Sequence, residues 1–354
     1  MLIRADASPE IGTGHVMRCL ALAQAWQDAG GKATFLMAQS TPSILARLAA
    51  ENCTVIPLSA VPGTNEDGDL TNECALRMEA EWLIVDGYAF SGQYQEQVRH
   101  HERKLLCVDD SGRCDRYVAD IVLNQNITAS ENDYPHCPPG TQLFLGPSFS
   151  LLRREFGPWR KWQRQISTMG RNVVVTLGGS TPVEAGVRAM ESLGRANIEG
   201  LRAIFVVGGS STGVAGVESC AAKFPEKISL RRDISNMAQL MAWADLAISA
   251  AGSTCWELCL LGLPAILLDV ADNQIPIAIE LERRGCALYA GNGNCVSRNE
   301  LANTLENLLL SQQARESMSH HSRQLVDGLG AERVVSAMRR TVREPHSAHT
   351  SATA

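Results

Sequence analysis

Short apolar segments alternate with amphipathic segments along most of the chain, and this alternation constrains the fold more than any other feature. The helical pattern is clearest in His15–Ala29, where Val16, Leu20 and Ala23 fall near one face. Unbroken apolar strands that alternate with helices are typical of parallel sheets covered by helices on both faces. The sequence therefore predicts an α/β protein.

The predicted elements form two groups, one in each half of the chain. The expected strands of the first half are Leu2–Ala5, Thr34–Met37, Val55–Leu58, Trp82–Val85, Leu105–Val108, Ile121–Leu123 and Leu143–Leu145. Those of the second half are Asn172–Leu177, Ala203–Val207, Ile228–Leu230, Leu246–Ser249, Ala265–Leu268 and Ala287–Ala290, with helices near Val183–Leu193, Met237–Ala244, Ser253–Leu261, Gln274–Arg284 and Asn299–Leu309. This arrangement indicates two doubly wound sheets.

A segment rich in Arg, Trp and Lys, Leu151–Gln165, separates the two groups and lacks a clear period. We therefore expect an N-terminal Rossmann-like domain at 1–152, an interdomain connection at 153–165 and a C-terminal Rossmann-like domain at 166–343. The remaining residues, 344–354, are mostly small and polar and are expected to be disordered. The polar segment Gly63–Thr71 is expected to be a loop.

Composition and missing motifs exclude several classes of function. The net charge of −6 gives no electrostatic basis for binding nucleic acid, and no apolar run reaches the roughly 18 residues needed for membrane insertion. The eleven cysteines are scattered without a C-x-x-C pair, and the amino terminus does not resemble a secretory signal, so we expect free thiols and a cytoplasmic protein. Neither a P-loop nor a metal-ligand motif is present, and we expect no cofactor and no metal.

The loop after the first strand carries the main catalytic candidate. Doubly wound sheets bind ligands beyond the carboxyl ends of their strands. In this loop Gly12 and Gly14 permit a tight turn, and His15 follows at the start of a helix. The positive end of a helix dipole favours the neutral imidazole, which is the form that a general base needs. The alternative is that the glycines only form a turn and His15 only caps or packs.

Polar groups also follow three other strands of the first half: Asp86-Gly87-Tyr88, Asp109-Asp110 and Asn124-Gln125-Asn126. Any one of these segments alone is better explained by turn formation or capping. Together they crowd one rim of one sheet, which favours a ligand site there.

Three strand ends in the second half have the features of a nucleotide-sugar site. Gly178–Ser180 and Gly252–Thr254 place glycines and a helix start where a diphosphate could approach backbone amides. Glu257 lies about one turn inside that helix, at a position suited to two ribose hydroxyls. Asp272–Gln274 begins the next helix at the same rim. The alternative is a capping serine with an ordinary helical glutamate.

Several of these segments resemble one family. Arg4–Ser8 with Ile11–Cys19 is similar to the opening of the nucleotide-sugar hydrolases of pseudaminic acid biosynthesis, which remove UDP from UDP-2,4-diacetamido-2,4,6-trideoxy-β-L-altropyranose. Further similarities are Val108–Asp110, Leu123–Asn126, Leu145–Pro147 with Leu152–Phe156, Gly178–Ser180, and Ala251–Thr254 with Glu257. The second-half motifs are shared with the wider GT-B glycosyltransferases, such as the lipid II synthase MurG.

The resemblance implies a GT-B fold, in which two Rossmann-like domains face each other across a cleft and the second holds UDP. It implies that His15 is the catalytic base and that Glu257 binds the ribose. The other expected substrate contacts are Asp6, Gly14, Arg18, Tyr88, Asp109, Asn126, Gly178, Gly179, Ser180, Gly252, Ser253, Thr254, Asn273 and Gln274. Two departures stand out: Thr181-Pro182 replaces a frequent aspartate, and Gly87 stands where a histidine is expected.

The expected reaction is hydrolysis with inversion, in which His15 activates a water that attacks the anomeric carbon opposite UDP. Many glycosidases need a second carboxyl group to protonate a poor leaving oxygen, whereas UDP leaves as a stable anion. One alternative is a GT-B glycosyltransferase that passes the sugar of a UDP-amino sugar to an acceptor. Another is a nucleotide-sugar-binding regulatory module without catalysis.

Overall fold

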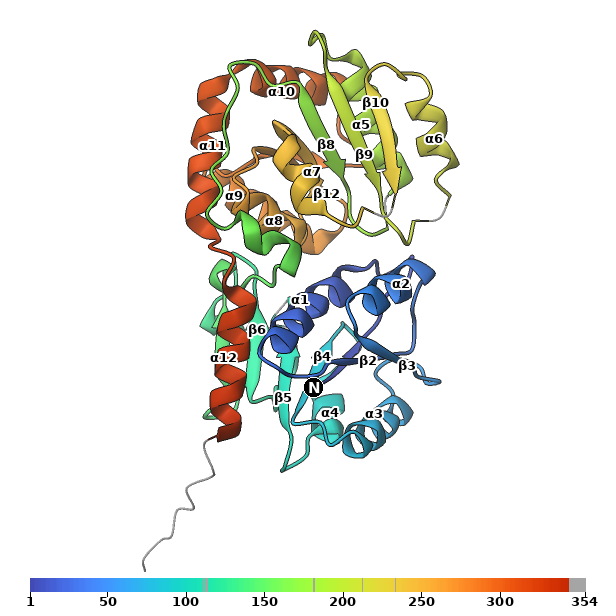
Figure 1. Ribbon diagram of the computed structural model, residues 1–354, viewed down its shortest axis with the longest axis vertical. Helices are drawn as coiled ribbons and strands as arrows, with labels where there is room; N and C mark the ends of the chain where they lie inside the picture. Colours follow the sequence, from blue (N-terminus) through green and yellow to red (C-terminus); the bar gives the residue numbers. More distant parts are fainter. Residues whose placement is uncertain (111, 113, 181, 212, 233, 344–354) are drawn as a thin grey trace, which may run out of the picture.

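The structure is a computed structural model that describes residues 1–343 except positions 111, 113, 181, 212 and 233. It contains two parallel sheets, one in each half of the chain, stacked end to end (Figure 1). The first has the strand order β3-β2-β1-β4-β5-β6-β7 and the second β10-β9-β8-β11-β12-β13. The prediction of two doubly wound α/β domains is confirmed. The tail expected to be disordered, 344–354, lies outside the described residues.

The elements of the first half agree closely with the sequence pattern. Its strands are β1 (Leu2–Ala5), β2 (Thr34–Met37), β3 (Thr54–Pro57), β4 (Trp82–Asp86), β5 (Lys104–Val108), β6 (Ile121–Asn124) and β7 (Gln142–Leu145). Its helices are α1 (Gly14–Asp28), α2 (Pro42–Ala50), α3 (Asn65–Arg77) and α4 (Gly92–Val98), and short 3₁₀ turns η1 (Glu131–Asp133), η2 (Pro147–Phe149) and η3 (Arg154–Trp159) follow.

The second half repeats the scheme. Its strands are β8 (Asn172–Thr176), β9 (Arg202–Val207), β10 (Ile228–Arg232), β11 (Leu246–Ala250), β12 (Ala265–Asp269) and β13 (Leu288–Asn292). Its helices are α5 (Val183–Arg195), α6 (Ala215–Ala221), α7 (Met237–Trp243), α8 (Thr254–Leu260), α9 (Ile275–Arg283), α10 (Arg298–Leu310), α11 (Gln312–Leu325) and α12 (Gly330–Arg343), with a 3₁₀ turn η4 (Asp272–Gln274).

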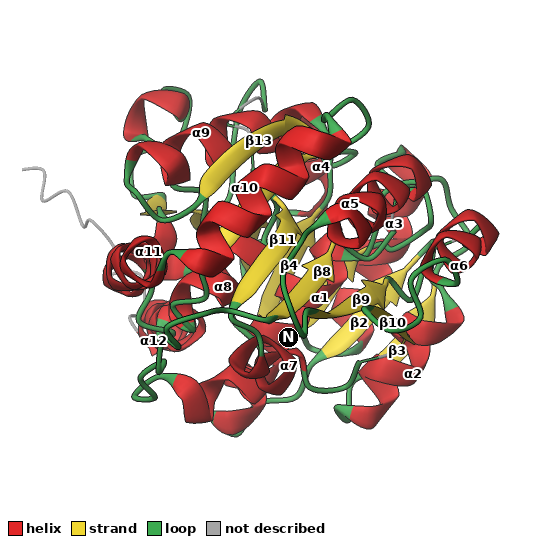
Figure 2. Ribbon diagram, turned by 90° about the horizontal axis from the view of Figure 1, so that it is seen from above, coloured by secondary structure: helices red, strands yellow, loops and turns green. Residues whose placement is uncertain are grey.

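Helices flank the strands of both sheets, as the view along the long axis shows (Figure 2). The central strands are buried along their whole length, including β1, β4, β11 and β12. Burial on both faces explains why these strands read as continuous apolar runs rather than as alternating patterns. Separate hydrophobic clusters fill the two faces of each sheet.

The order of the strands creates one switch point in each sheet. In the first sheet the chain builds outward from β1 through β2 to β3, then returns to place β4 on the other side of β1. In the second sheet β8 and β11 have the same relation. Loops leaving two adjacent strands in opposite directions open a crevice at this point, where open α/β sheets bind ligands. The loops after β1, β4, β8 and β11 are therefore the ones that the fold places at a binding crevice.

The last helix belongs to the core of the first domain, although it follows the second domain in sequence. Ala331, Val334, Val335 and Met338 of α12 are buried in the hydrophobic cluster that contains α1. Figure 1 shows α12 running along the first domain below α11. The expected C-terminal domain, 166–343, thus includes a helix that packs on the N-terminal domain. The boundaries at 152 and 165 stay predictions.

The expectation of a loop over Gly63–Thr71 is wrong, because α3 begins at Asn65. The Thr64 hydroxyl accepts the Asp67 N–H and caps the helix, and acidic residues in the first turn favour its positive end. The polar composition concealed this helix. Asp67 itself is fully buried, so the segment is polar for a structural reason rather than because it is a solvated loop.

Asp67 anchors α3 to β1 through a buried ion pair with Arg4. The Arg4 Nε and NH2 groups donate to the two Asp67 oxygens at 2.9 Å each, and Thr71 and Tyr94 donate to the same carboxylate. Both charged residues have no exposed surface. Removing one member of such a pair leaves the other charge buried without its main partner.

We expect Asp67→Ala to lower the free energy of unfolding by about 3–5 kcal/mol, because Arg4 would stay buried without the carboxylate that accepts two of its hydrogen bonds. Urea unfolding of the two proteins measures this difference. Glu218→Ala is the control: its ion pair with Arg232 is about half exposed, and its loss should cost less than about 1 kcal/mol. Equal losses in the two variants would contradict the structural role of Asp67.

Candidate active site

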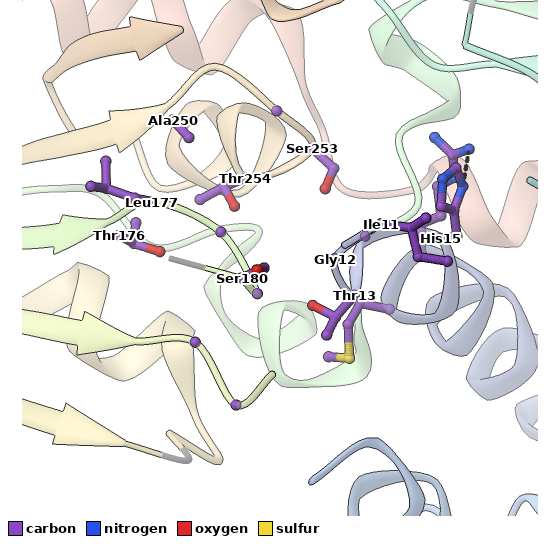
Figure 3. Close-up of a pocket in the computed structure, with 18 of the residues that line it drawn as sticks. Ile11, Gly12, Thr13, His15, Thr176, Leu177, Ser180, Ala250, Ser253 and Thr254 are labelled. Carbon is purple, nitrogen blue, oxygen red and sulfur yellow. Dashed lines mark hydrogen bonds between the residues drawn. The ribbon is translucent and has the colours of Figure 1, made fainter. Parts of the chain in front are cut away.

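A cavity of about 1420 Å³ lies between the two domains and is lined by both. The loop after β1 and the start of α1 face it from the first domain. The loops after β8, β9, β11 and β12 face it from the second domain. Figure 3 shows Thr13 and His15 on one side, opposite Ser180, Ser253 and Thr254 on the other. The binding crevices of the two sheets therefore form one site.

His15 is held by a carboxylate from the neighbouring strand. Ala5 at the end of β1 pairs with Asp86 at the end of β4, which brings Asp86 beneath the start of α1. The His15 Nδ1 lies 2.6 Å from Asp86 Oδ1, and both side chains are buried. Arg18 NH2 lies 3.2 Å from the same nitrogen, but the 2.6 Å contact with the carboxylate is much shorter. Because the ionised carboxylate can only accept, we assign the proton to Nδ1, which leaves Nε2 as the basic nitrogen. None of the described residues forms a hydrogen bond with Nε2.

Arg18, one turn further along α1, completes this charged cluster. Its Nε and NH2 groups donate to the two Asp86 oxygens at 2.6 Å each, and its NH1 group donates to Asp110 at 2.5 Å. Burial alone would raise the pKa of Asp86, but the Arg18 guanidinium and His15 outweigh it and hold that pKa well below its usual range. Asp86 therefore stays ionised.

Tyr88 connects the two domains beside His15. Its ring meets the imidazole edge to face with 4.9 Å between ring centres, and its hydroxyl accepts a hydrogen bond from Asn273 Nδ2 at 3.1 Å. Burial and the Asp110 carboxylate raise the pKa of Tyr88 to about 12, so its hydroxyl stays protonated. The side chain is nevertheless 66% exposed, which is high for an aromatic ring beside a buried histidine.

The glycine loop after β8 touches the loop after β1 across the cleft. A Cβ atom on Gly179 would lie 1.8 Å from Thr13 Oγ1, so only glycine permits this approach. Ser180 donates a hydrogen bond to the Pro9 carbonyl at 2.5 Å. Thr41 and Ser210 form another contact across the cleft, with 3.0 Å between their hydroxyl oxygens. The two domains are thus closed against each other at this edge.

Glu257 is fixed by a chain of charges that crosses the interdomain connection. Its carboxylate lies 2.9 Å from Arg153 NH1, Arg153 pairs with Glu155, and Glu155 pairs with Arg47 of α2. Arg47 also donates to the Ser235 carbonyl of the second domain. Burial raises the pKa of Glu257 to about 7, although the Arg153 guanidinium opposes this shift.

The structure brings nearly all the expected site residues together. Those that line the cavity are Gly14, His15, Arg18, Tyr88, Asn126, Gly178, Gly179, Ser180, Gly252, Ser253, Thr254, Glu257, Asn273 and Gln274. Asp109 lines a smaller adjoining cavity instead. Asp6 lines neither: one of its oxygens accepts the Ala38 and Gln39 N–H groups, and the other pairs with Arg4. Asp6 therefore shapes the loop after β2 and is not placed to contact a substrate.

Asp86 and Asp110 were expected at this rim from the sequence, but not their role of holding Arg18. Arg153 and Arg47, which belong to the charged chain that reaches Glu257, were not among the expected site residues. The position of Asp86 directly after an apolar strand was a usable signal, but its meaning depends on β4 lying beside β1.

The structure adds two observations on metals and membranes. Over the described part of the chain, His100, His101 and Glu102 form the one group of side chains close enough to share a metal ion, and they are consecutive surface residues away from the cleft. Within 1–343, apart from the five undescribed positions, no helix is long and apolar enough to cross a bilayer.

Comparisons with known proteins bear on both halves of the chain. Residues 173–334 match the glycosyltransferase family 28 C-terminal domain. A relative named spore coat polysaccharide biosynthesis protein SpsG, from Bacillus subtilis, is 25% identical over 338 residues, which cover 95% of this chain and 96% of the relative. A UDP-2,4-diacetamido-2,4,6-trideoxy-β-L-altropyranose hydrolase from Campylobacter jejuni is 25% identical over 287 residues, covering 80% of this chain and 97% of the relative.

An uncharacterized protein from Methanocaldococcus jannaschii is also 25% identical, over 270 residues. This match covers 74% of the present chain but only 54% of the relative, so the chain spans about half the length of that protein.

Solved structures support the same fold. MurG from Acinetobacter baumannii superimposes with a TM-score of 0.65 at 18% identity, covering 96% of this chain and 99% of MurG. The Staphylococcus aureus protein MnaA, solved with UDP, gives a TM-score of 0.63 at 12% identity and covers 96% of each chain. The chain is thus a GT-B protein whose second half matches the glycosyltransferase family 28 C-terminal domain, and most of whose length is similar to the UDP-2,4-diacetamido-2,4,6-trideoxy-β-L-altropyranose hydrolases.

Proposed function

We propose that the protein is a UDP-sugar hydrolase that cleaves the anomeric C–O bond of UDP-2,4-diacetamido-2,4,6-trideoxy-β-L-altropyranose, or of a closely related diacetamido sugar, with inversion. The observation that carries this proposal is the Asp86–His15 pair, whose 2.6 Å contact leaves the imidazole Nε2 as a base in a cleft lined by glycine loops. The products are UDP and the free sugar.

His15 takes the part of the general base. Asp86 fixes the proton on Nδ1, so Nε2 keeps its lone pair for a proton from water. That water attacks the anomeric carbon, its oxygen forms the new C–O bond, and the bond to the diphosphate oxygen breaks on the opposite face. Asp86 stabilises the imidazolium that forms, and Arg18 keeps Asp86 ionised and in place.

The second domain provides the surroundings of the leaving group. Cys255 and Trp256 at the start of α8 donate to the Gly252 and Ser253 carbonyls. Within the described residues, the N–H groups of Gly252, Ser253 and Thr254, at the turn after β11, donate to no other residue, and these residues line the cavity. Gly178–Ser180 presents a second glycine-rich turn across the same cavity. Backbone amides placed in this way stabilise a departing diphosphate without a strong acid. Glu257, at the same helix, then accepts the ribose hydroxyls.

The comparisons support the choice of substrate. A relative matched over nearly its whole length is named as a UDP-2,4-diacetamido-2,4,6-trideoxy-β-L-altropyranose hydrolase. Another is named for spore coat polysaccharide biosynthesis, which agrees with a role in making a sugar for the cell surface. Incubation of the pure protein with a panel of UDP-diacetamido sugars, followed by NMR of UDP and of the product anomer, tests both the reaction and the sugar.

The match to a glycosyltransferase domain supports a second function, transfer of the sugar to an acceptor. The two functions differ in the product formed without an acceptor. A hydrolase releases free sugar and UDP at its full rate, whereas a transferase releases them slowly and accelerates when its acceptor is added.

We expect His15→Asn to lower kcat by at least about 10²-fold while UDP affinity stays unchanged. The asparagine amide can still donate to Asp86, so the buried carboxylate keeps a partner, but no basic nitrogen remains. Saturation kinetics and calorimetry with UDP measure the two effects. Near-normal turnover would rule out His15 as the base.

We expect Asp86→Asn to lower kcat only because it weakens the action of His15 as a base. The neutral amide no longer fixes the Nδ1 proton or stabilises the imidazolium. In a His15→Asn background the same change should therefore lower kcat no further, because the two residues act as a unit. Full additivity of the two losses in this double-mutant cycle would show that Asp86 acts elsewhere, for example only by holding Arg18.

We expect UDP to bind more tightly as the pH rises through about 7. Only the ionised Glu257 carboxylate accepts both ribose hydroxyls, and burial keeps the group partly protonated near neutrality. The gain should be roughly tenfold between about pH 6 and about pH 8.

Glu257→Gln is the control for this pH effect, because UDP itself titrates near pH 6 and contributes to both proteins. The pH dependence that belongs to Glu257 is the difference between the two profiles. Parallel profiles would show that Glu257 does not titrate in the binding site.

A further inference from the structure

A second cavity of about 300 Å³ opens beside His15 and lies wholly within the first domain. His15, Arg18, Tyr88 and Asp110 line both cavities, so these residues form the wall between them. We name the second cavity the side pocket. Its other walls are the loop after β4, the start of α4 and the segment that follows β5. Nothing in the mechanism above uses it.

The size and the walls of the side pocket limit what it can hold. Ligand pockets commonly measure about 300–1,000 Å³, so this one suits a small group rather than a nucleotide. Phe90 and Tyr117 supply apolar surface, whereas Asp109, Asp110 and Asp115 disfavour an anion. The occupant is therefore a small group that is uncharged or cationic and partly apolar.

Gln95 indicates whether the occupant is uncharged or cationic. It lines the side pocket and has no exposed surface. Its Oε1 accepts the Val118 N–H at 3.2 Å, which fixes Nε2 as the donor end. The contacts of Nε2 are with sulfur, 3.4 Å from Cys114 and 3.7 Å from Cys107. Sulfur is a weak acceptor, so the buried Gln95 Nε2–H groups would gain from a stronger hydrogen-bond acceptor.

A carbonyl oxygen can accept a hydrogen bond from Gln95 Nε2, whereas an ammonium group has only donors and cannot. An acylamino group has both the carbonyl and an apolar end that packs on the aromatic rings. We propose that the side pocket binds an acylamino substituent of the sugar, with Gln95 donating to its carbonyl oxygen, and so selects acylated over free amino sugars. This assignment rests on the proposed function, because it places the hexose beside His15.

Two variants test the pocket by turnover. Gln95→Glu keeps an acceptor for the Val118 N–H but removes the donor, and Cys114→Phe fills the pocket from its partly exposed wall. The substrates are a UDP-diacetamido hexose and its counterpart with one free amine. Gln93→Glu, an exposed position on the same helix, is the matched control.

We expect kcat/KM for the diacetamido substrate to fall roughly tenfold or more in both pocket variants, with UDP affinity unchanged. The preference over the free amine should shrink by a similar factor, and Gln93→Glu should behave as the wild type. Equal losses on both substrates, or no loss in either variant, would overturn the assignment. Failure of the wild type to hydrolyse either substrate would instead refute the proposed function.

A second measurement needs no turnover. In the His15→Asn protein, saturating diacetamido substrate should slow alkylation of Cys114 by iodoacetamide, whereas UDP alone should not. Burial raises the pKa of the Cys114 thiol, so the reaction is run at alkaline pH. Exposed Cys295, followed by peptide mass spectrometry in the same sample, is the internal control. An unchanged Cys114 rate with bound sugar nucleotide would show that the side pocket stays empty.

Discussion

The site depends on the hydrogen bonds and ion pairs that the Asp86 carboxylate forms. This carboxylate is buried at the end of β4, and it is shared by three side chains of α1, those of His15, Arg18 and Cys19. A buried carboxylate is tolerated only when it is paired and hydrogen-bonded. The Arg18 guanidinium supplies the compensating charge, and His15 adds a hydrogen bond to the same carboxylate. One buried anion thus fixes both the imidazole and the guanidinium in the wall of the cleft.

The second domain has an analogous arrangement at Glu257, with a different outcome. Arg153 forms an ion pair with that carboxylate but is shared with Glu155, so burial prevails and the pKa of Glu257 rises to about 7. Because Glu155 also pairs with Arg47 of the first domain, a continuous chain of ion pairs joins Glu257 in the second domain to α2 in the first. A ligand that replaces Arg153 as the partner of Glu257 changes the balance of charge at the place where the domains are joined.

The sequence predicted both sheets and most of the loops at the cleft, because buried parallel strands and glycine turns leave strong local patterns. The same local patterns placed His15, the glycine loops and Glu257 at strand ends, and these residues do line the cavity. It did not predict that Asp86 holds His15, since that contact depends on β4 lying next to β1, and strand order is not a local property. The same limit applies to α12, whose apolar face gives no sign of which domain it covers. In α3 the local pattern was misleading, because a buried aspartate made a helix resemble a loop.

The chain passes between the domains twice, once at the segment that contains η3 and once before α12. At the first connection Glu155 pairs with Arg153 and with Arg47 of α2. Neutral hydrogen bonds also join the domains: the Ser180 hydroxyl with Pro9, Thr41 with Ser210, and Asn273 with Tyr88. Neutral hydrogen bonds of this kind contribute about 0.5–1.5 kcal/mol each, so the cleft can open for substrate without unfolding either domain. In this structure Asn273 contacts Tyr88 and the glycine loop after β8 meets Thr13, so the two domains touch each other on the wall of the cleft that holds His15.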